Sequence, residues 1–348
     1  MIKLTRNDEL VLYGLARWPD LNDEELSAKI DVKRSTVTAI RNKLARDGVY
    51  TRHNVPDLER IGCELLVASY CDFSPLTPWS KREAYVSEDP ELFYRISTDA
   101  SRLSIVAAEN FTEVKRYLDS VTSRHATHGF LFSEGVRYVY FPFALSSLIM
   151  FYNFARLLNK CFELGFDDDS VPDLAPKKRR VRLSDTEKQA LYIMVEYPRA
   201  NDRDIAEKIS VTRQTVNNVR RRMISEGLLK TVVFPDLAKL GFELIAFTHA
   251  DIYPGVTMDK RWDNAMEVVR EGSQYLIVSG NTESIMLSAF GNYTDFERTH
   301  EEILGLYSKS NFLARAPTIK IYPTNDIRNH MKLRCGPLVK KVLGINNV

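Results

Sequence analysis

The sequence predicts an α+β protein made of two tandem copies of one unit, each a winged helix-turn-helix followed by a ferredoxin-like βαββαβ domain. Two observations lead to this prediction. Residues 4–66 align without a gap onto residues 183–245, at a constant offset of 179 and with twenty identical positions. C-terminal to each aligned stretch, the spacing of the apolar residues changes from a helical pattern to strand-like runs. A period this long indicates a domain duplication, so one chain is expected to form a pseudo-dimer by itself, with its two α/β units packed together.

The composition is typical of a globular protein. The 348 residues are 44% hydrophobic and 27% charged, which is enough for two or three domains with their own cores. There is no apolar run of membrane-spanning length and no secretory segment at the start, and the four cysteines are scattered without a CxxC pair. We therefore expect a cytoplasmic protein with no membrane partner, no obligatory metal and no cofactor.

Each copy begins with three predicted helices. Asn22 and Asn201 stand where an N-cap residue is expected before the second helix. Gly48 and Gly227 follow the third helix, in the position that favours a helix-ending glycine. The predicted helices are residues 5–18, 26–30 and 34–47 in the first copy and residues 184–197, 205–209 and 213–226 in the second.

The third helix has one apolar stripe and one polar, basic face. Arg, Asn, Gln, Ser and Thr are the side chains that contact base edges and phosphates. A short helix, a tight turn and a polar second helix predict a helix-turn-helix, and residues 49–52 and 228–233 predict the strand of a wing. The alternative is a three-helix bundle with a solvated face. The candidate DNA-binding residues are Lys33, Arg34, Ser35, Thr38, Arg41, Asn42, Thr212, Arg213, Gln214, Asn217, Asn218, Arg220 and Arg221.

The two copies differ in charge and in the outward residues of the third helix. Residues 177–240 carry fifteen Lys/Arg against eight Asp/Glu, whereas residues 1–60 carry eleven against ten. The second winged domain should therefore supply most of the phosphate contacts. It also has Gln, Asn and Arg where the first has Ser, Thr and Ala, which predicts one well-specified and one looser half-site, about one helical turn apart.

The sequence behind each winged unit predicts the order βαββαβ, which is that of a ferredoxin-like domain. In the first copy the expected strands are 63–73, 92–97, 102–107 and 136–141, with helices over 79–87 and 111–124. In the second they are 242–252, 274–279, 284–290 and 318–322, with helices over 258–271 and 294–308.

Two segments lie outside the repeat. Residues 143–164 predict one long helix packed between the halves; a membrane-surface helix is the alternative, which the lack of a basic polar face disfavours. Residues 167–180 are acidic and then basic with two prolines, as in an exposed linker. The expected domains are 1–60 and 183–240 (winged helix-turn-helix), 61–142 and 241–348 (α/β, the latter with a C-terminal helix), and 143–182 (connecting helix and linker).

Two stretches resemble a known family. They are DEELSAKI at 23–30 leading to RSTV at 34–37, and DIAEKI at 204–209 leading to RQTV at 213–216. Together with the Pro-Asp-Leu after each wing and the βαββαβ order, they resemble the Lrp/AsnC (leucine-responsive) family of transcription regulators over residues 4–142 and 183–322. The resemblance implies a sequence-specific regulator whose third helices enter the major groove of double-stranded DNA. It also implies α/β domains that pair chains into a homodimer and can hold a small-molecule effector.

Two other functions are compatible with the sequence. Siroheme decarboxylases share this architecture, and their chemistry needs histidines and basic groups around a tetrapyrrole carboxylate. Of the six histidines only His125 and His128 are close-set, without a counterpart in the second half, and we expect them on the surface at a helix end. The other alternative is an interaction module whose winged domains have lost DNA binding. Because there is no glycine-rich phosphate loop, nucleophile elbow or paired acid motif, the sequence favours a regulator without catalytic residues, not an enzyme.

Overall fold

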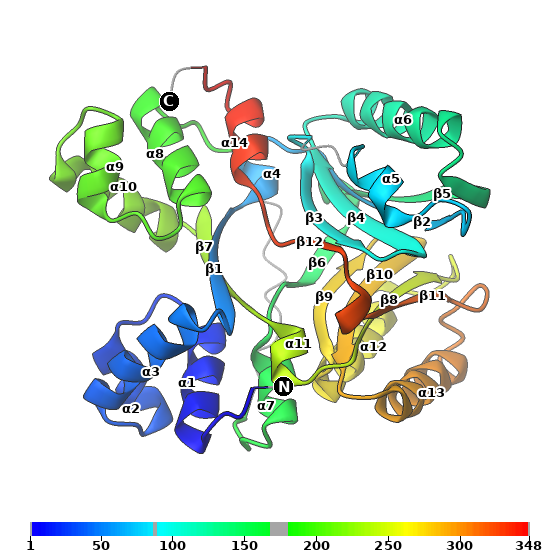
Figure 1. The fold of residues 1–348 in the computed structure, drawn as a ribbon, viewed down its shortest axis with the longest axis horizontal. Coiled ribbons are helices and arrows are strands. Elements are labelled where there is room, and N and C mark those ends of the chain that lie inside the picture. Colours follow the sequence, from blue (N-terminus) through cyan, green and yellow to red (C-terminus); the bar gives the residue numbers. More distant parts are fainter. Residues whose placement is uncertain (1, 86–88, 168–179, 347–348) are drawn as a thin grey trace. The chain divides into compact units, whose positions relative to one another are not determined.

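The computed structural model describes residues 2–85, 89–167 and 180–346 (Figure 1). The chain divides into two compact units, and each unit combines segments from both halves of the sequence. The first unit comprises Met1–Thr51, Leu145–Leu174 and Val232–Asn325, and the second comprises Arg52–Ala144, Ala175–Thr231 and Asp326–Val348. Each unit therefore joins the helices of one repeat to the α/β domain of the other. The chain passes between the units within strands β1 (Tyr50–Pro56) and β7 (Leu229–Pro235).

Three helices open the first unit, and local sequence explains their ends. Thr5 and Asn22 form capping boxes at the starts of α1 and α2, so the first free N–H groups of both helices have acceptors. Gly48 follows α3 with φ of 63°, in the left-handed region that glycine adopts without strain. The apolar sides of these helices form a buried core that includes Val11, Leu26, Val37 and Leu44. The helices are α1 (Arg6–Arg17), α2 (Asp23–Ile30) and α3 (Arg34–Arg46).

The second unit contains the corresponding trio. Ser184 and Asn201 form the capping boxes of α8 and α9, and Gly227 ends α10 with φ of 66°. Leu191, Ile205, Val216 and Met223 are buried. The helices are α8 (Asp185–Glu196), α9 (Asp202–Lys208) and α10 (Arg213–Ser225). The predicted N-caps and terminal glycines are confirmed in both copies.

Both α/β domains have the predicted ferredoxin-like order, with elements that differ from the predicted ranges mainly at their ends. In the first unit the sheet order is β11-β8-β10-β9-β6, where β6 is Ser147–Phe151. In the second unit it is β12-β3-β4-β2-β5, where β12 is Asn329–Met331, and neighbouring strands are antiparallel. The first unit contains β8 (Leu244–Asp251), α12 (Met258–Glu271), β9 (Gln274–Ser279), β10 (Glu283–Phe290), α13 (Tyr293–Lys309) and β11 (Thr318–Pro323). The second contains β2 (Leu65–Phe73), α5 (Trp79–Glu83), β3 (Leu92–Ser97), β4 (Ser101–Ala108), α6 (Phe111–Thr127) and β5 (Leu131–Pro142).

The predicted single helix over 143–164 is wrong. The segment forms strand β6 (Ser147–Phe151) and the short helix α7 (Ala155–Cys161). β6 pairs antiparallel with β9 as an edge strand, and Ile149 and Met150 join the core of that domain. Tyr152 then turns the chain at φ of 46°. An apolar run of this length fits a strand or a helix equally well, and the free edge of β9 decides in favour of the strand.

The shorter elements complete the two units. β12 (Asn329–Met331) pairs with β3 at the edge of the second unit's sheet, in the place that β6 takes in the first. Helices α4 (Leu58–Ile61), α11 (Leu237–Leu240) and α14 (Gly336–Val342), the last being the predicted C-terminal helix, lie outside the sheets. Most of the predicted linker at 167–180 and the end of the predicted helix over 79–87 lie outside the described residues. In the part of the chain that is described, every helix is too short or too polar to cross a membrane.

Candidate functional site

Helix α10 presents a polar, basic face to solvent. Its N-cap Thr212 accepts a hydrogen bond from the Thr215 N–H, which fixes where the helix begins. Val216 and Met223 are buried and fix the rotation of the helix about its axis. Five of the predicted DNA-binding residues are exposed on this helix or at its cap: Thr212, Arg213, Gln214, Asn218 and Arg221. They are thus available to a partner.

Helix α3 presents a face that its own domain partly neutralises. The Arg34 Nη1 lies 3.5 Å from the Glu24 carboxylate, and the Thr38 hydroxyl donates to Asp23 at 2.6 Å. The position equivalent to Glu24 in the second copy is Arg203, which pairs with Glu207 at 3.0 Å. The predicted residues that are exposed here are Lys33, Arg34, Ser35, Thr38 and Asn42.

The arginine that both third helices share is held inside each domain. Arg220 Nε donates to Asp202 Oδ1 at 2.7 Å, and Arg41 Nη1 lies 3.1 Å from Asp23 Oδ1. Asn217 also donates to Asp202, at 3.1 Å. Burial acts to raise the pKa of Asp202, but the hydrogen bonds from Asn217 and Arg220 outweigh it and hold that pKa below its usual value. These three predicted residues tie the third helix to the second in their domains.

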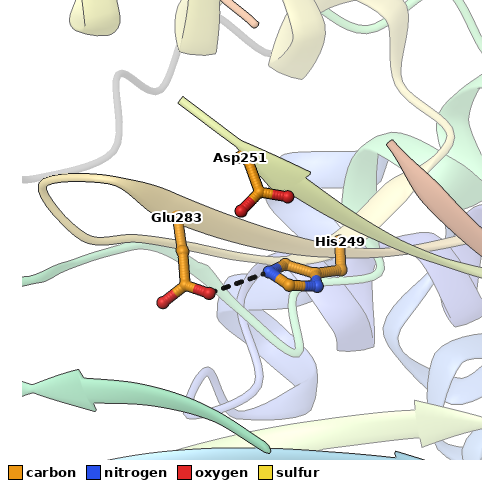
Figure 2. Close-up of side chains that lie close together, drawn as sticks. All are labelled: His249, Asp251 and Glu283. Atoms are coloured by element: carbon orange, nitrogen blue, oxygen red, sulfur yellow. Dashed lines mark hydrogen bonds and ion pairs between the residues drawn. The ribbon is translucent and has the colours of Figure 1, made fainter. Parts of the chain in front are cut away.

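A second group of side chains, which sequence reasoning missed, lies on the sheet of the first unit (Figure 2). Glu283 of β10 stands opposite Asp251 of β8, and His249 is two residues earlier on the same face. One ligand atom from each residue lies within 4.8 Å of the others, and His249 Nε2 is 3.2 Å from Glu283 Oε1. A histidine and two carboxylates can hold a divalent cation such as Zn²⁺ or Mn²⁺.

The carboxylates of this group already have partners. Arg315 Nε donates to Asp251 Oδ2 at 2.6 Å, and Glu283 binds His249. A cation would have to displace the Arg315 guanidinium from Asp251. The alternation of His249 and Asp251 along one strand was the signal available in the sequence, but only the strand register brings Glu283 to them.

Comparison with protein families finds a match within the second copy. Residues 183–230 match the family described as winged helix-turn-helix DNA-binding. The match covers α8, α9 and α10 and ends at the start of β7. No curated protein matches the chain.

Among solved structures, one enzyme has this fold over nearly its whole length. The crystal structure of the siroheme decarboxylase NirDL matches with a TM-score of 0.54 and 9% identity, covering 97% of this chain and 99% of that one. Its complex with an iron-uroporphyrin III analogue matches with a TM-score of 0.51 and 9% identity, over 92% of both chains. At this identity the likeness describes the fold alone.

The matches to NirDL correct one expectation. The prediction that the chain is not an enzyme is contradicted, because an enzyme has the same architecture from end to end. An AsnC family transcriptional regulator from Agrobacterium tumefaciens also matches, with a TM-score of 0.33 and 20% identity, over 39% of this chain and 89% of that one. The chain is therefore an α+β protein with a winged helix-turn-helix DNA-binding domain and ferredoxin-type domains.

Proposed function

We propose that this chain binds double-stranded DNA through α10 and acts as a sequence-specific transcription regulator. The observation that supports the proposal is the exposed polar face of α10 within the stretch that matches a DNA-binding family. A helix that carries outward Arg, Gln and Asn side chains can enter the major groove and bind base edges there.

The exposed residues of α10 divide into two roles. Gln214 Nε2 donates to Asn218 Oδ1 at 3.1 Å, so the two amides lie one turn apart on the same face, and each can pair with adenine. Arg213 and Arg221 are exposed cations that can contact guanine or phosphate. Arg220 and Asn217, held by Asp202, position the helix and do not themselves need to contact DNA.

The test is fluorescence anisotropy with a labelled fragment from upstream of the protein's own gene. The double substitution R213A/R221A should weaken binding, and it should lower the log–log salt slope by about 0.9 for each DNA phosphate that the variant no longer neutralises. The control R116A/R298A removes the same charge from exposed positions on α6 and α13, and should leave both quantities unchanged. Equal losses of affinity for the two double variants would contradict the proposal.

We further propose that a small molecule bound by an α/β domain modulates DNA binding and that chains pair into homodimers. The support is the ferredoxin-type fold of both domains. Analytical ultracentrifugation of the full chain tests the pairing, and a monomer at micromolar concentration would contradict it.

A second candidate function is decarboxylation of a tetrapyrrole. The fold match to NirDL over 97% of the chain supports it at the level of architecture. Adding iron-uroporphyrin III to the full chain should then shift the Soret band, and mass spectrometry should detect loss of carbon dioxide from the tetrapyrrole. An unchanged spectrum at millimolar porphyrin would exclude this candidate and leave the DNA-binding proposal untouched.

A further inference from the structure

Three arginines are buried inside the α/β domain of the second unit. Arg82 on α5, Arg95 on β3 and Arg102 on β4 are 3%, 4% and 8% exposed. Arg95 stands opposite Ser104, and Arg102 stands opposite Ser97, so both arginines project from one face of the sheet. That face carries the core against which α6 packs, beside the sheet in Figure 1.

The cluster is bound together by specific contacts. Arg102 Nη1 donates to His125 Nε2 at 2.9 Å, and the Nδ1 of that ring donates to the Val121 carbonyl at 2.7 Å. Burial first, and then the charge of Arg102, lower the pKa of His125 to about 4, so the imidazole is neutral. The ring of Phe73 lies 3.8 Å from the Arg82 guanidinium carbon and 5.8 Å from that of Arg102. His125 is thus buried, and its predicted surface position is wrong.

Each of the three arginines has one buried side-chain nitrogen that donates to no acceptor. The atoms are Nη1 of Arg82, Nε of Arg95 and Nε of Arg102. Burial and the neighbouring Arg102 lower the pKa of Arg95 to about 10, and Asp89 is the carboxylate whose charge opposes this effect. Buried guanidinium groups with unused donors are costly unless an anion accepts from them.

The α/β domain of the first unit forms the same fold without most of these charges. It comes second in the sequence and is called the second α/β domain below, and the domain that carries the three arginines is called the first α/β domain. By strand register and helix position, Arg95 corresponds to Ile277, Arg102 to Ser284 and His125 to Tyr307. These residues line a cavity of about 30 Å³ in the sheet–helix interior of that domain. The fold therefore does not require Arg95 or Arg102.

Arg82 alone has a charged counterpart. Its Nε donates to the Thr77 carbonyl at 3.3 Å, and Arg261 donates to the equivalent carbonyl of Val256 at 3.0 Å. Both arginines also donate to the loop between the second and third strands, at Asp99 and at Gly280. Arg82 and Arg261 thus hold the same loop in the two domains. The cations that distinguish the first α/β domain are Arg95 and Arg102.

An open cleft adjoins the cluster. It has a volume of about 610 Å³, and three of its lining residues, Phe73, Thr77 and Asp99, contact Arg82. Trp79 also lines it, with its ring 5.7 Å from the Arg82 guanidinium carbon. Asp99 and Arg328, which form an ion pair at 2.9 Å, also line the cleft. Two of its walls are therefore aromatic, and Arg82 lies directly behind them.

We propose that the first α/β domain binds a small organic carboxylate, whose anionic group accepts hydrogen bonds from Arg82, Arg95 and Arg102 and whose apolar body lies against Phe73 and Trp79. The two oxygens of a carboxylate can accept about four hydrogen bonds, enough for the three unused donors. As an effector site it rests on the proposed function, but ligand binding is measured without DNA, so the two proposals can fail separately.

The test is isothermal titration of the full chain with phenylpyruvate, citrate and inorganic phosphate. Phenylpyruvate should bind best, because it combines a carboxylate with an aromatic ring. R95I and R102S, which introduce the residues of the second domain, should each weaken binding by about tenfold or more. R95I should not lower the melting temperature of the free protein, since the second domain folds with isoleucine there, whereas R102S should lower it, because it removes the donor to the buried His125. The control R124S removes a neighbouring exposed charge on α6 and should bind like the unmodified chain.

Several results would overturn the site. They are no binding of either carboxylate at millimolar concentration, unchanged binding by both variants, or a lower melting temperature of the ligand-free R95I protein. Binding of inorganic phosphate alone would overturn the assignment of a carboxylate ligand.

Discussion

Arg41 and Arg220 occupy equivalent positions in the two winged units, and each is bound to the first residue of the preceding helix. Arg220 lies 2.7 Å from Asp202, and Arg41 lies 3.1 Å from Asp23. Both pairs are less than one-third exposed, so the solvent screens them less than it screens an ordinary surface pair. Arginine often binds phosphate in DNA-binding proteins. In these two units, however, it fixes the angle between the two helices of the motif.

Replacing Asp202 by asparagine should therefore destabilise the second winged unit. The substitution D202N leaves Arg220 without its charged acceptor, which should lower the free energy of unfolding by about 1–3 kcal/mol. The control E207Q breaks the exposed pair with Arg203 and should change it by less than about 0.5 kcal/mol. Urea unfolding measures both. A loss of stability for D202N no larger than that for E207Q would contradict this role of Asp202.

The same pair predicts a pH dependence. Because the pKa of Asp202 is lowered in the folded chain, its stabilising contribution is complete above the ordinary Asp value of 3.8 and is lost as the pH falls through the lowered pKa. The unfolding free energy of the unmodified chain should thus fall more steeply in acid than that of D202N. Parallel pH profiles would show that Asp202 does not titrate in this way.

Arg315 should control whether the group of His249, Asp251 and Glu283 binds a cation. The unmodified chain should bind Zn²⁺ weakly, because the guanidinium holds Asp251. The substitution R315Q frees that carboxylate and should tighten Zn²⁺ binding in calorimetry, whereas H249A should remove it. If R315Q leaves the affinity unchanged, the guanidinium is not what limits the site.

At the scale of elements, Gly48 and Gly227 end the third helices in the left-handed region of backbone conformation. A Cβ on Gly227 would meet no atom within 4 Å, so any cost of alanine there comes from its φ of +66°. The substitution G227A should lower stability by about 1–2 kcal/mol, and G227N should cost less. G305A, inside α13, should instead stabilise by about 0.5–1 kcal/mol. Thermal unfolding distinguishes these signs, and a neutral G227A would refute the argument.

Elements specified by nearby residues were predictable, and elements specified by distant partners were not. The capping boxes of α2 and α9 lie within four residues of sequence, so Asn22 and Asn201 could be recognised directly. Strand β6 depends on the free edge of β9, more than a hundred residues away. The buried Arg95 and Arg102 become neighbours only through the register of β3 and β4, which spacing along the chain does not give.

At the scale of the whole molecule, the fold does not identify the activity. A siroheme decarboxylase has it over 99% of its length, although its sequence is only 9% identical to this chain. The expectation that the chain is not an enzyme failed because architecture is shared while sites are specific. Function must therefore be decided from the side chains at α10 and at the arginine cluster.

The two winged units should also differ in what they read on DNA. α10 exposes Gln214, Asn218 and Arg221, which can make two-pronged contacts worth about 1–3 kcal/mol of discrimination each. α3 exposes Ser35 and, beside it, a Thr38 whose hydroxyl already donates to Asp23. Less sequence discrimination is therefore available at α3 than at α10.

We expect one chain to select a strongly specified half-site and a weakly specified one. Selection from random DNA, followed by footprinting, should give an asymmetric consensus, with any palindrome arising from two chains. The substitution Q214A should relax the strong half-site, because it removes an adenine-pairing amide, whereas S35A should leave the consensus unchanged. Both positions are the second residue of their helices, which makes the pair a matched comparison. A symmetric site bound by a single chain, or equal relaxation by both substitutions, would mean that the two units read DNA alike despite their different faces.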